Sequence, residues 1–411
     1  MISIVMLAIM AGCAIYLFLK GTLAQGIAMI FNALLAGFAA FGFYEMLTEY
    51  LIKYSPGVAV WAPMICFLLL FVLVFAILQA GTMQISKEKI DLGKLPEQIG
   101  RPVAGVILGY VVTGHLLVAA AMAPIPSEYP YPRFDDRNPN PANPTKPLLS
   151  PDGFAAGLFG TVSTGSFSPI GEPKSFAMMH AGFIDQLYLN RLKGKDVSLM
   201  TATEAFRTPG KDGVWEAPEN LRDSEGKPVS SQAGKNLMLV RVEFRQAAMK
   251  DASKFTLSQF RLVCGPKTTA GPLAAKGEAV YPAGYIGAGG RLETKALGEI
   301  ISIDPAKVPS EGVTMDLAFH VPTSLTPVLI EFKRNNVARV SAVASAEDAP
   351  QPIPFGSSAP KPQAEPQPES ADEQPAEPSA EPGQDDPAPQ RRKRGRSDIT
   401  RSVTGDLEGE N

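Results

Sequence analysis

Three polar side chains stand inside the apolar stretches of the N-terminal third of the chain: Asn32, Thr113 and His115, with Glu45 near the end of one stretch. A proton relay or a transport site usually needs paired ionisable groups at mid-membrane depth, and these residues do not form such a pair. We therefore expect the His115 ring to bond to a neighbouring backbone carbonyl. An intramembrane polar site made of Asn32, Thr113 and His115 is the alternative.

The remaining sequence contains no recognisable set of catalytic residues. His180 and His320 are too far apart, and too lightly accompanied, to indicate a metal site or a nucleophile and base. Ser163, Ser166 and Ser168 stand close to glycines, as is typical of turns. We expect neither enzymatic activity nor a cofactor or bound metal, and a membrane-anchored hydrolase is a competing hypothesis.

The elements that carry these residues begin with four apolar stretches, each long enough to cross a bilayer. A helix rises about 1.5 Å per residue, so a hydrocarbon core of about 30 Å needs roughly 20 apolar residues. The predicted spans are Ile2 to Leu19, Gly26 to Leu47, Val58 to Ala80 and Val103 to Ala123. We expect an integral membrane protein whose residues 1–122 form a bundle of four helices in the bilayer.

Positive charge predicts the orientation of these spans, because Lys and Arg in short loops tend to stay in the cytoplasm. Lys20 and a group in the third loop fall on one side, whereas the second loop offers only Lys53 against Glu45 and Glu49. The third-loop group is Lys87, Lys89, Lys94 and Arg101. Both termini, and with them the soluble portion of the chain, are then predicted to be extracytoplasmic.

Small residues recur at a spacing of four within the predicted spans. Gly105 and Gly109 form GxxxG, and Ala33 and Gly37 repeat the spacing. Such residues let helix backbones approach closely. Packing within the chain and homo-oligomerisation both explain the motif.

In its layout, the N-terminal region resembles the colicin V production protein (CvpA) family. The features shared with that family are Lys20-Gly21 after the first span, a second span with Gly26, Ala33 and Gly37, the dense run from Phe67 to Phe75, and the spaced glycines Gly93, Gly100, Gly105 and Gly109. The resemblance implies a bacterial inner-membrane protein that acts in colicin V export and in maintenance of the cell envelope, without catalytic activity.

The chain departs from the family pattern at two places. Pro96-Glu97-Gln98 replaces the usual pair of an acidic residue and an arginine before the glycines, and Tyr110 stands where an arginine is often found. The resemblance therefore implies no role for those charged groups here.

Residues 123–151 contain nine prolines. Proline fixes its own backbone torsion and biases the preceding residue toward extended geometry, so we predict a semi-rigid spacer that lifts the following domain off the bilayer. Tyr129, Tyr131 and Phe134 are candidates for the headgroup level, with exposure to solvent as the alternative.

Residues 152–345 have the composition of a globular extracytoplasmic domain. Phe154, Leu158 and Phe159, and later Phe183, Leu187 and Leu192, predict one or two short helices. Alternating apolar and polar residues predict strands at 239–245, 260–264, 315–321 and 328–332. These strands favour an antiparallel β-sandwich that weakly resembles bacterial Ig-like surface modules. The predicted fold is thus a four-span helical membrane bundle plus a mainly-β sandwich.

Residues 346–411 are predicted to form a disordered tail, since 350–389 carry twelve prolines among polar residues. The tail ends near a basic cluster that either binds an anionic surface or is simply solvated: Arg391, Arg392, Lys393, Arg394 and Arg396. A formal net charge of -3 and the absence of a basic aromatic surface argue against nucleic acid as a partner.

The cysteines Cys13, Cys66 and Cys264 offer no disulfide framework and are expected to be free thiols. The partners expected for the whole chain are the lipid bilayer, an unknown envelope protein or polymer, and a second copy of the chain. We interpret the sequence as that of an envelope-maintenance or export protein with an outer binding module. An oligomeric channel or transporter for small solutes is the alternative.

Overall fold

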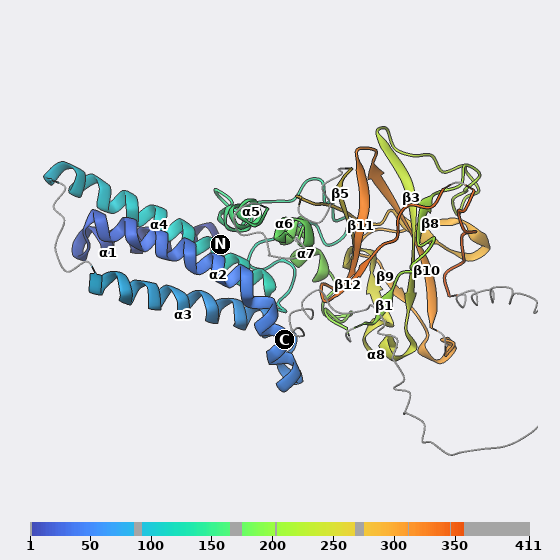
Figure 1. Cartoon of the computed structure of the whole chain (residues 1–411), viewed down its shortest axis with the longest axis horizontal. Coiled ribbons are helices and arrows are strands. Elements are labelled where there is room, and N and C mark those ends of the chain that lie inside the picture. Colours follow the sequence, from blue (N-terminus) through green and yellow to red (C-terminus); the bar gives the residue numbers. More distant parts are fainter. Residues whose placement is uncertain are drawn as a thin grey trace, which may run out of the picture.

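The computed structural model describes residues 2–85, 93–164, 175–201, 204–267, 275–310, 312–345 and 347–356. A helical bundle and a β domain lie end to end, with three short helices between them (Figure 1). The Arg391 to Arg396 cluster, together with Ser166 and Ser168, lies outside the described residues.

The bundle is made of the four predicted spans: α1 (Ile2–Lys20), α2 (Leu23–Tyr54), α3 (Ala62–Ile85) and α4 (Lys94–Met122). All four are long and apolar enough to cross a membrane, which confirms the predicted bundle. Thr22 caps α2, because its side chain accepts the Gln25 N–H and the Gln25 side chain accepts the Thr22 N–H. A short 3₁₀ turn, η1 (Pro56–Val58), leads from α2 toward α3.

Two of these helices are longer than their apolar runs. α2 continues to Tyr54 beyond the predicted Leu47, and α4 begins at Lys94 instead of Val103. The added residues include Glu49 and Glu97, which hydropathy excludes from a span but which a helix tolerates where it leaves the hydrocarbon. A charged helix end thus remains helical outside the bilayer.

Three short helices follow: α5 (Pro151–Ser163), α6 (Phe176–Met179) and α7 (Phe183–Asn190). The apolar spacing predicted α5 and α7 at these positions. Both pack against the bundle, since Ala155, Phe159 and Leu187 share one buried cluster with Phe41 and Phe67 of the spans.

The proline-rich segment does not hold these helices away from the bundle, contrary to the predicted spacer. Tyr131 and Phe134 are buried in the same cluster, and only Tyr129 is exposed. Prolines stiffen a chain without preventing it from packing, and here the two aromatic rings fill the space between the bundle and α7.

The β domain contains two facing antiparallel sheets. The larger sheet has the order β1-β3-β10-β7-β8, with β2 also paired to β3, and the smaller has the order β12-β11-β5-β6. The larger-sheet strands are β1 (Phe206–Arg207), β2 (Val214–Glu216), β3 (Lys235–Phe244), β7 (Gly284–Ile286), β8 (Leu292–Thr294) and β10 (Val313–Pro322). The smaller-sheet strands are β5 (Phe260–Pro266), β6 (Glu278–Val280), β11 (Leu325–Phe332) and β12 (Asn336–Arg339).

One apolar core joins the inner faces of the two sheets. β3 and β10 pair from Val313 opposite Phe244 to Pro322 opposite Lys235. Their Val240, Leu317 and Phe319 share a buried cluster with Leu262 of β5 and Ile330 of β11. This core confirms the predicted antiparallel β-rich domain, while the Ig-like resemblance stays a prediction.

Smaller elements close the ends of the sandwich. β4 (Lys254–Thr256) pairs with β9 (Ile300–Ser302) in a separate ribbon. The helical turns are η2 (Gln246–Ala248), α8 (Met249–Ala252), η3 (Leu257–Gln259), η5 (Ala288–Gly290) and η6 (Pro305–Lys307). The smaller sheet lies toward the bundle and the larger sheet lies away from it (Figure 1).

Much of the outer face of β3 is covered, although the alternation of apolar and charged residues in 239–245 is typical of a half-buried strand. Arg241 is buried and forms a two-bond ion pair with the buried Asp316 of β10. Residues 347–356 lie over this pair, with the Ile353 N–H donating to Asp316 Oδ2 at 2.7 Å. Ordered packing therefore extends to residue 356, beyond the predicted start of the tail at 346.

Candidate functional site

The predicted intramembrane polar residues are each bonded separately. Asn32 Nδ2 of α2 donates to Gln79 Oε1 and to Thr82 Oγ1 of α3, both at 3.1 Å. Thr113 Oγ1 donates to Gly109 O at 2.6 Å. Among the described residues, no hydrogen bond joins Asn32, Thr113 and His115 into one group.

The His115 ring is bonded and stacked within the bundle. Its Nδ1 lies 2.8 Å from Val111 O, as the sequence predicted, and its ring stacks on Phe71 with centroids 4.8 Å apart. A Cβ on Gly37 would lie 1.9 Å from His115 Nε2, so Gly37 leaves the space that the ring occupies. These contacts give His115 a packing role between α2, α3 and α4.

The GxxxG residues lie against α1. A Cβ added to Gly105 would meet Ala14 Cα at 2.4 Å, and one on Gly109 would meet Met10 Cα at 2.6 Å. Ala33 is buried beside Leu17 and Leu108. The motif residues therefore serve close packing within one chain in this structure.

Glu97 and Arg101 form an ion pair at the end of the bundle far from the β domain. Glu97 Oε2 also accepts the Leu23 N–H at 3.1 Å, which places a carboxylate at the N-terminus of α2, where the helix dipole favours negative charge. An acidic residue and an arginine thus pair ahead of Gly105 and Gly109, although they are four positions apart and the sequence pattern did not reveal the pair.

At the other end of the bundle, aromatic rings connect the spans to the short helices. The ring of Phe41 lies 5.0 Å from Phe67 of α3 and 5.1 Å from Phe159 of α5. Phe176 and Phe183 complete the group at 5.5 Å and 6.1 Å from Phe41. We call this junction, with the polar groups described next, the bundle–β junction.

A chain of polar groups crosses the bundle–β junction. Arg133 Nε pairs with Asp185 Oδ1 of α7 at 2.6 Å, and Arg133 Nη1 donates to the Tyr131 hydroxyl at 2.9 Å. That hydroxyl donates in turn to the buried Asp152 of α5. Burial raises the pKa of the Asp185 carboxyl above its ordinary value, while the neighbouring Arg133 opposes this rise.

Arg191, at the end of α7, holds the chain that leaves α4. Its guanidinium donates to Ala123 O, Ile125 O and Tyr129 O at 3.2, 3.3 and 3.0 Å. It also lies 4.7 Å from the ring centroid of Tyr188. Burial, together with the positive charge of the nearby Arg334, lowers the Arg191 pKa to about 10, while Tyr188 opposes this fall.

A second buried arginine attaches α6 and α7 to the smaller sheet. Arg261 of β5 pairs with Glu331 of β11, and Glu331 also accepts from Gln186 of α7. The Arg261 guanidinium donates to Ala181 O, and to Met179 O at 2.9 Å. Every charged group in this set has a partner, which a buried ion pair requires if it is not to destabilise the fold.

One contact between polar side chains joins α2 directly to the α6–α7 region. His180 Nε2 lies 3.1 Å from Glu45 Oε1, which also accepts the Tyr44 hydroxyl at 2.8 Å. Burial lowers the pKa of Arg334 of the β domain, and the nearby carboxylates of Glu45 and Glu331 oppose this fall. Glu45, noted in the sequence only as a polar residue near a span end, is thus part of the junction.

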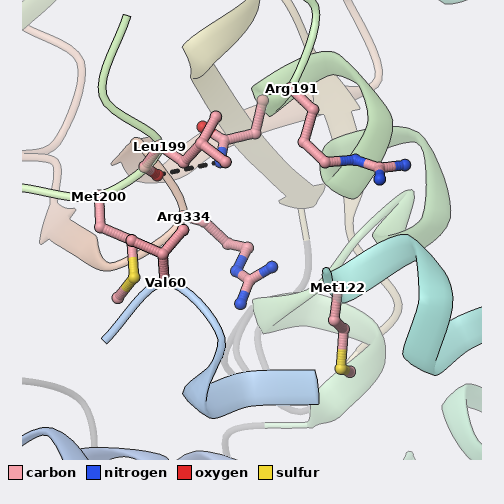
Figure 2. A pocket seen from close by; sticks show the side chains of 7 residues that line it. Val60, Met122, Arg191, Leu199, Met200 and Arg334 are labelled. Atoms are coloured by element: carbon pink, nitrogen blue, oxygen red, sulfur yellow. Dashed lines mark hydrogen bonds between the residues drawn. The ribbon is translucent and has the colours of Figure 1, made fainter. Parts of the chain in front are cut away.

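The recess beside Arg334 is small. It is lined by Val60, Met122, Asn190, Arg191, Leu199, Met200 and Arg334 and has room for about one water molecule. Figure 2 shows the Arg334 side chain lying between Val60 and Met122, with the Arg191 guanidinium directed away from it. Such a recess does not accommodate an organic substrate, and the two arginines do not converge on one ligand.

Metal-binding residues are likewise not gathered in the part of the chain that the structure describes. It contains no group of three or more His, Cys, Asp or Glu side chains that could hold a metal ion. His320 has its pKa lowered by burial and by Lys235. The residues of the bundle–β junction therefore hold the two parts of the molecule together, through aromatic packing and paired buried charges.

Sequence reasoning did not identify the charged residues of the junction. Arg133 is separated by a long stretch of chain from Asp185 and Arg191, and no motif links the three residues. The available signal was local: Asp185 and Arg191 flank the predicted apolar face of α7, and Arg133 stands among buried aromatic residues.

The fold and the junction define a class of protein: a multi-span helical membrane protein that carries an attached β domain. Residues 2–133 match the model of a family described as Colicin V production protein. The membrane region of this chain is therefore similar to that family, and the β domain lies beyond the matched residues. Comparisons with curated proteins and with solved structures gave no match.

Proposed function

We propose that this protein maintains the cell envelope, or assists export through it, from the bacterial cytoplasmic membrane. In this proposal the bundle is the anchor, the β domain lies outside the cytoplasm, and its outer surface binds an envelope protein or polymer. The protein acts as a binding scaffold and not as an enzyme. The bilayer and an envelope component are its partners, and self-association through the bundle is a further outcome to be tested.

The observation that carries the proposal is the docking of the β domain on the bundle. α7 contacts both parts, since Arg191 binds Ala123 O near the end of α4, and Ser258 Oγ of η3 donates to Leu189 O at 2.9 Å. A domain attached at several points presents one face away from the membrane. Preorganised surfaces of this kind lose less entropy on binding a partner.

The outermost surface lies over the larger sheet and is rich in charged side chains. Residues 217–229 cover this sheet, with Lys227 and Glu225 exposed in an ion pair. The edges of the sheet are themselves occupied: the Ala344 N–H donates to Val214 O of β2, and Ser224 N–H donates to Leu292 O of β8. Loop side chains therefore fit a partner better than addition of a strand at these edges.

A channel or transporter is the second candidate, and it has weaker support. The polar side chains Asn32, Thr113 and His115 bond to neighbouring groups instead of lining a described cavity. Flux of small solutes through proteoliposomes that contain the full chain would favour this candidate over a scaffold.

Orientation is tested first, by labelling single cysteines with a membrane-impermeant reagent in intact cells. We expect labelling at Ser55→Cys, in the second loop, and at Glu225→Cys on the β domain, but not at Lys94→Cys at the start of α4. Labelling of Lys94→Cys without Glu225→Cys would contradict the proposed orientation.

Partner binding is tested with variants of the outer surface in cells that depend on this chain. Arg222→Glu with Lys227→Glu should reduce resistance to detergent or export of a reporter, whereas Lys195→Glu, near the bundle, is the matched control. A photo-crosslinker at Glu225 should capture an envelope component. Unchanged phenotypes at normal protein levels, with no captured component, would overturn the envelope role.

A further inference from the structure

The segment from Pro147 to Thr164 has an unusual composition for a region outside the four spans. Its only charged residue is Asp152, which is buried and bonded to Tyr131. The exposed large side chains are apolar: Leu148, Leu149 and Phe154 are 48%, 65% and 40% exposed. This segment therefore shows an uncharged, largely apolar surface to its surroundings.

The segment lies beside the middle of α4 and not beyond its end. The Tyr110 hydroxyl donates to Leu149 O at 3.0 Å, and the rings of Tyr110 and Phe154 are 5.3 Å apart. A Cβ on Gly114 would lie 2.4 Å from Pro151 O, so Gly114 permits the close approach of α5. At about 1.5 Å per residue, Tyr110 and Gly114 lie roughly 18 and 12 Å before the end of α4.

The depth of α5 follows from α3, which contains no charged residue. With about 1.5 Å per residue and a hydrocarbon core of about 30 Å centred on α3, Phe71 lies roughly 10 Å and Phe67 roughly 5 Å inside the boundary. Phe71 stacks on His115, which follows Gly114 of α4, and Gly114 lies against Pro151 at the start of α5. Phe67 contacts Phe41, which stacks on Phe159 near the other end of α5. α5 therefore slopes from about 10 to about 5 Å of depth, the range of interfacial helices.

The exposed side of this segment continues the lipid-facing surface of α4. Val106 and Ile107 of α4 are exposed apolar residues close in sequence to Tyr110. The inward side of α5 carries Ala155 and Phe159, both buried against the bundle. An apolar outer side at this depth fits acyl chains and does not fit water.

The backbone of the segment also suits a bilayer, where unsatisfied polar groups are costly. Pro147 and Pro151 have no N–H, the Ser150 N–H donates to Pro147 O at 3.0 Å, and Leu149 O accepts from Tyr110. Leu149 and Ser150 have φ of 58° and 44°, so a tight left-handed turn joins the incoming chain to α5.

We propose that residues 147–163 form a fifth membrane-embedded element, a short helix with its preceding turn inserted among the acyl chains of the leaflet nearest the β domain. The occupant of the exposed apolar surface is lipid, continuous with the lipid around α4. This proposal stands independently of the envelope function, because it concerns where the chain meets the bilayer.

Site-directed spin labelling of the full chain in phospholipid nanodiscs tests the proposal. Cys66 and Cys264 are buried and stay in place, while Cys13 is replaced by Ala and the unlabelled parent gives the background. Labels are placed at Leu149→Cys and Phe154→Cys. Ile107→Cys on α4 is the lipid-facing reference, and Glu225→Cys, 68% exposed on the β domain, is the aqueous reference.

The measurement compares collisions of each label with oxygen, which enters lipid, and with a water-soluble nickel chelate. At Leu149 and Phe154 we expect an oxygen-to-nickel ratio about tenfold or more above that at Glu225 and close to that at Ile107, since polar solutes enter hydrocarbon poorly. A ratio equal to that at Glu225 would overturn the proposal. Shielding from both reagents would also overturn it, because protein, such as a second copy of the chain, would then cover the segment.

Discussion

The bundle and the β domain solve the problem of burying polar groups in different ways. The bundle contains few polar side chains, and most of them form hydrogen bonds within one helix turn or with one neighbouring helix. Its helices α1 and α4 approach closely at Gly105 and Gly109. The β domain buries full charges, such as Arg241 with Asp316, inside a layered structure. In lipid, close backbone contact replaces the hydrophobic effect as the main source of helix association. In water, an apolar core can also hold paired charges.

The bundle–β junction combines both solutions. Phe41 and Phe159 pack as in the bundle, while Arg133 and Asp185 pair as in the β domain. Variants at matched positions in the two regions and at the junction can therefore test whether the regions differ as described.

The largest effect is expected in the β domain, from Asp316→Ala. This change leaves the Arg241 charge buried and unpaired and removes the acceptor of the Ile353 N–H, at a cost of about 3–5 kcal/mol in free energy of unfolding. Denaturant titration of the full chain, followed by fluorescence of the buried Trp215 near Arg241, measures the loss. Glu204→Ala breaks the exposed pair with Arg245 and should cost less than about 1 kcal/mol. Equal losses in free energy of unfolding for Asp316→Ala and Glu204→Ala would contradict the difference expected between a buried and an exposed ion pair.

At the junction, Arg191→Met is expected to loosen the chain that follows α4. Loss of three hydrogen bonds from a charged donor should lower the local opening free energy of residues 123–130 by about 2–3 kcal/mol. Hydrogen exchange with mass spectrometry measures this opening. The matched variant Arg207→Met removes an exposed pair on β1 and should leave the exchange of 123–130 unchanged.

Within the bundle, Gly105→Ala should force α1 and α4 apart. The added methyl would meet Ala14 Cα at 2.4 Å, and overpacking of this kind costs about 1–3 kcal/mol. Unfolding in mixed micelles with increasing SDS reports the change. Gly81→Ala, where nothing lies within 4 Å, should be neutral or slightly stabilising because alanine favours the helix. The idea fails if the two variants behave alike.

The smallest effect is expected at alkaline pH, where the charge of Lys333 in the β domain changes the free energy of unfolding. Burial lowers the pKa of Lys333 to about 8, against an ordinary value of 10.5. The unfolded chain therefore binds more protons between these values, so this lysine makes the domain more stable as pH rises from about 8 to 10, by roughly 1 kcal/mol or more. Lys333→Met should flatten that rise in denaturant titrations at pH 8 and pH 10. An unchanged slope would count against the assignment.

The sequence predicted elements where local pattern decides structure. The run from Phe67 to Phe75 is apolar on every side, so a span follows from length alone, and the alternation in Val240, Val242 and Phe244 places one face of β3 in a core. The spacing of Phe183 and Leu187 located α7 for the same reason.

The prediction was incomplete where distant segments meet. Alternation sends Arg241 to the side of β3 away from the core, but the side chain is buried because residues near Gln351 and Ile353 cover it. Arg133 and Asp185, like Glu45 and His180, pair across long stretches of chain. No periodicity in the sequence encodes such partners, because they depend on how complete elements dock.

The position of α7 also determines how mechanical load would pass through the molecule. A pull on the β domain reaches α7 through Ser258 and Gln259, which donate to Leu189 O and Asn190 O, and leaves it through Arg191 to the carbonyls that follow α4. These bonds connect the β domain to the first residues of the proline-rich segment, so part of a tension on the domain would reach the end of α4 without passing through the rest of that segment.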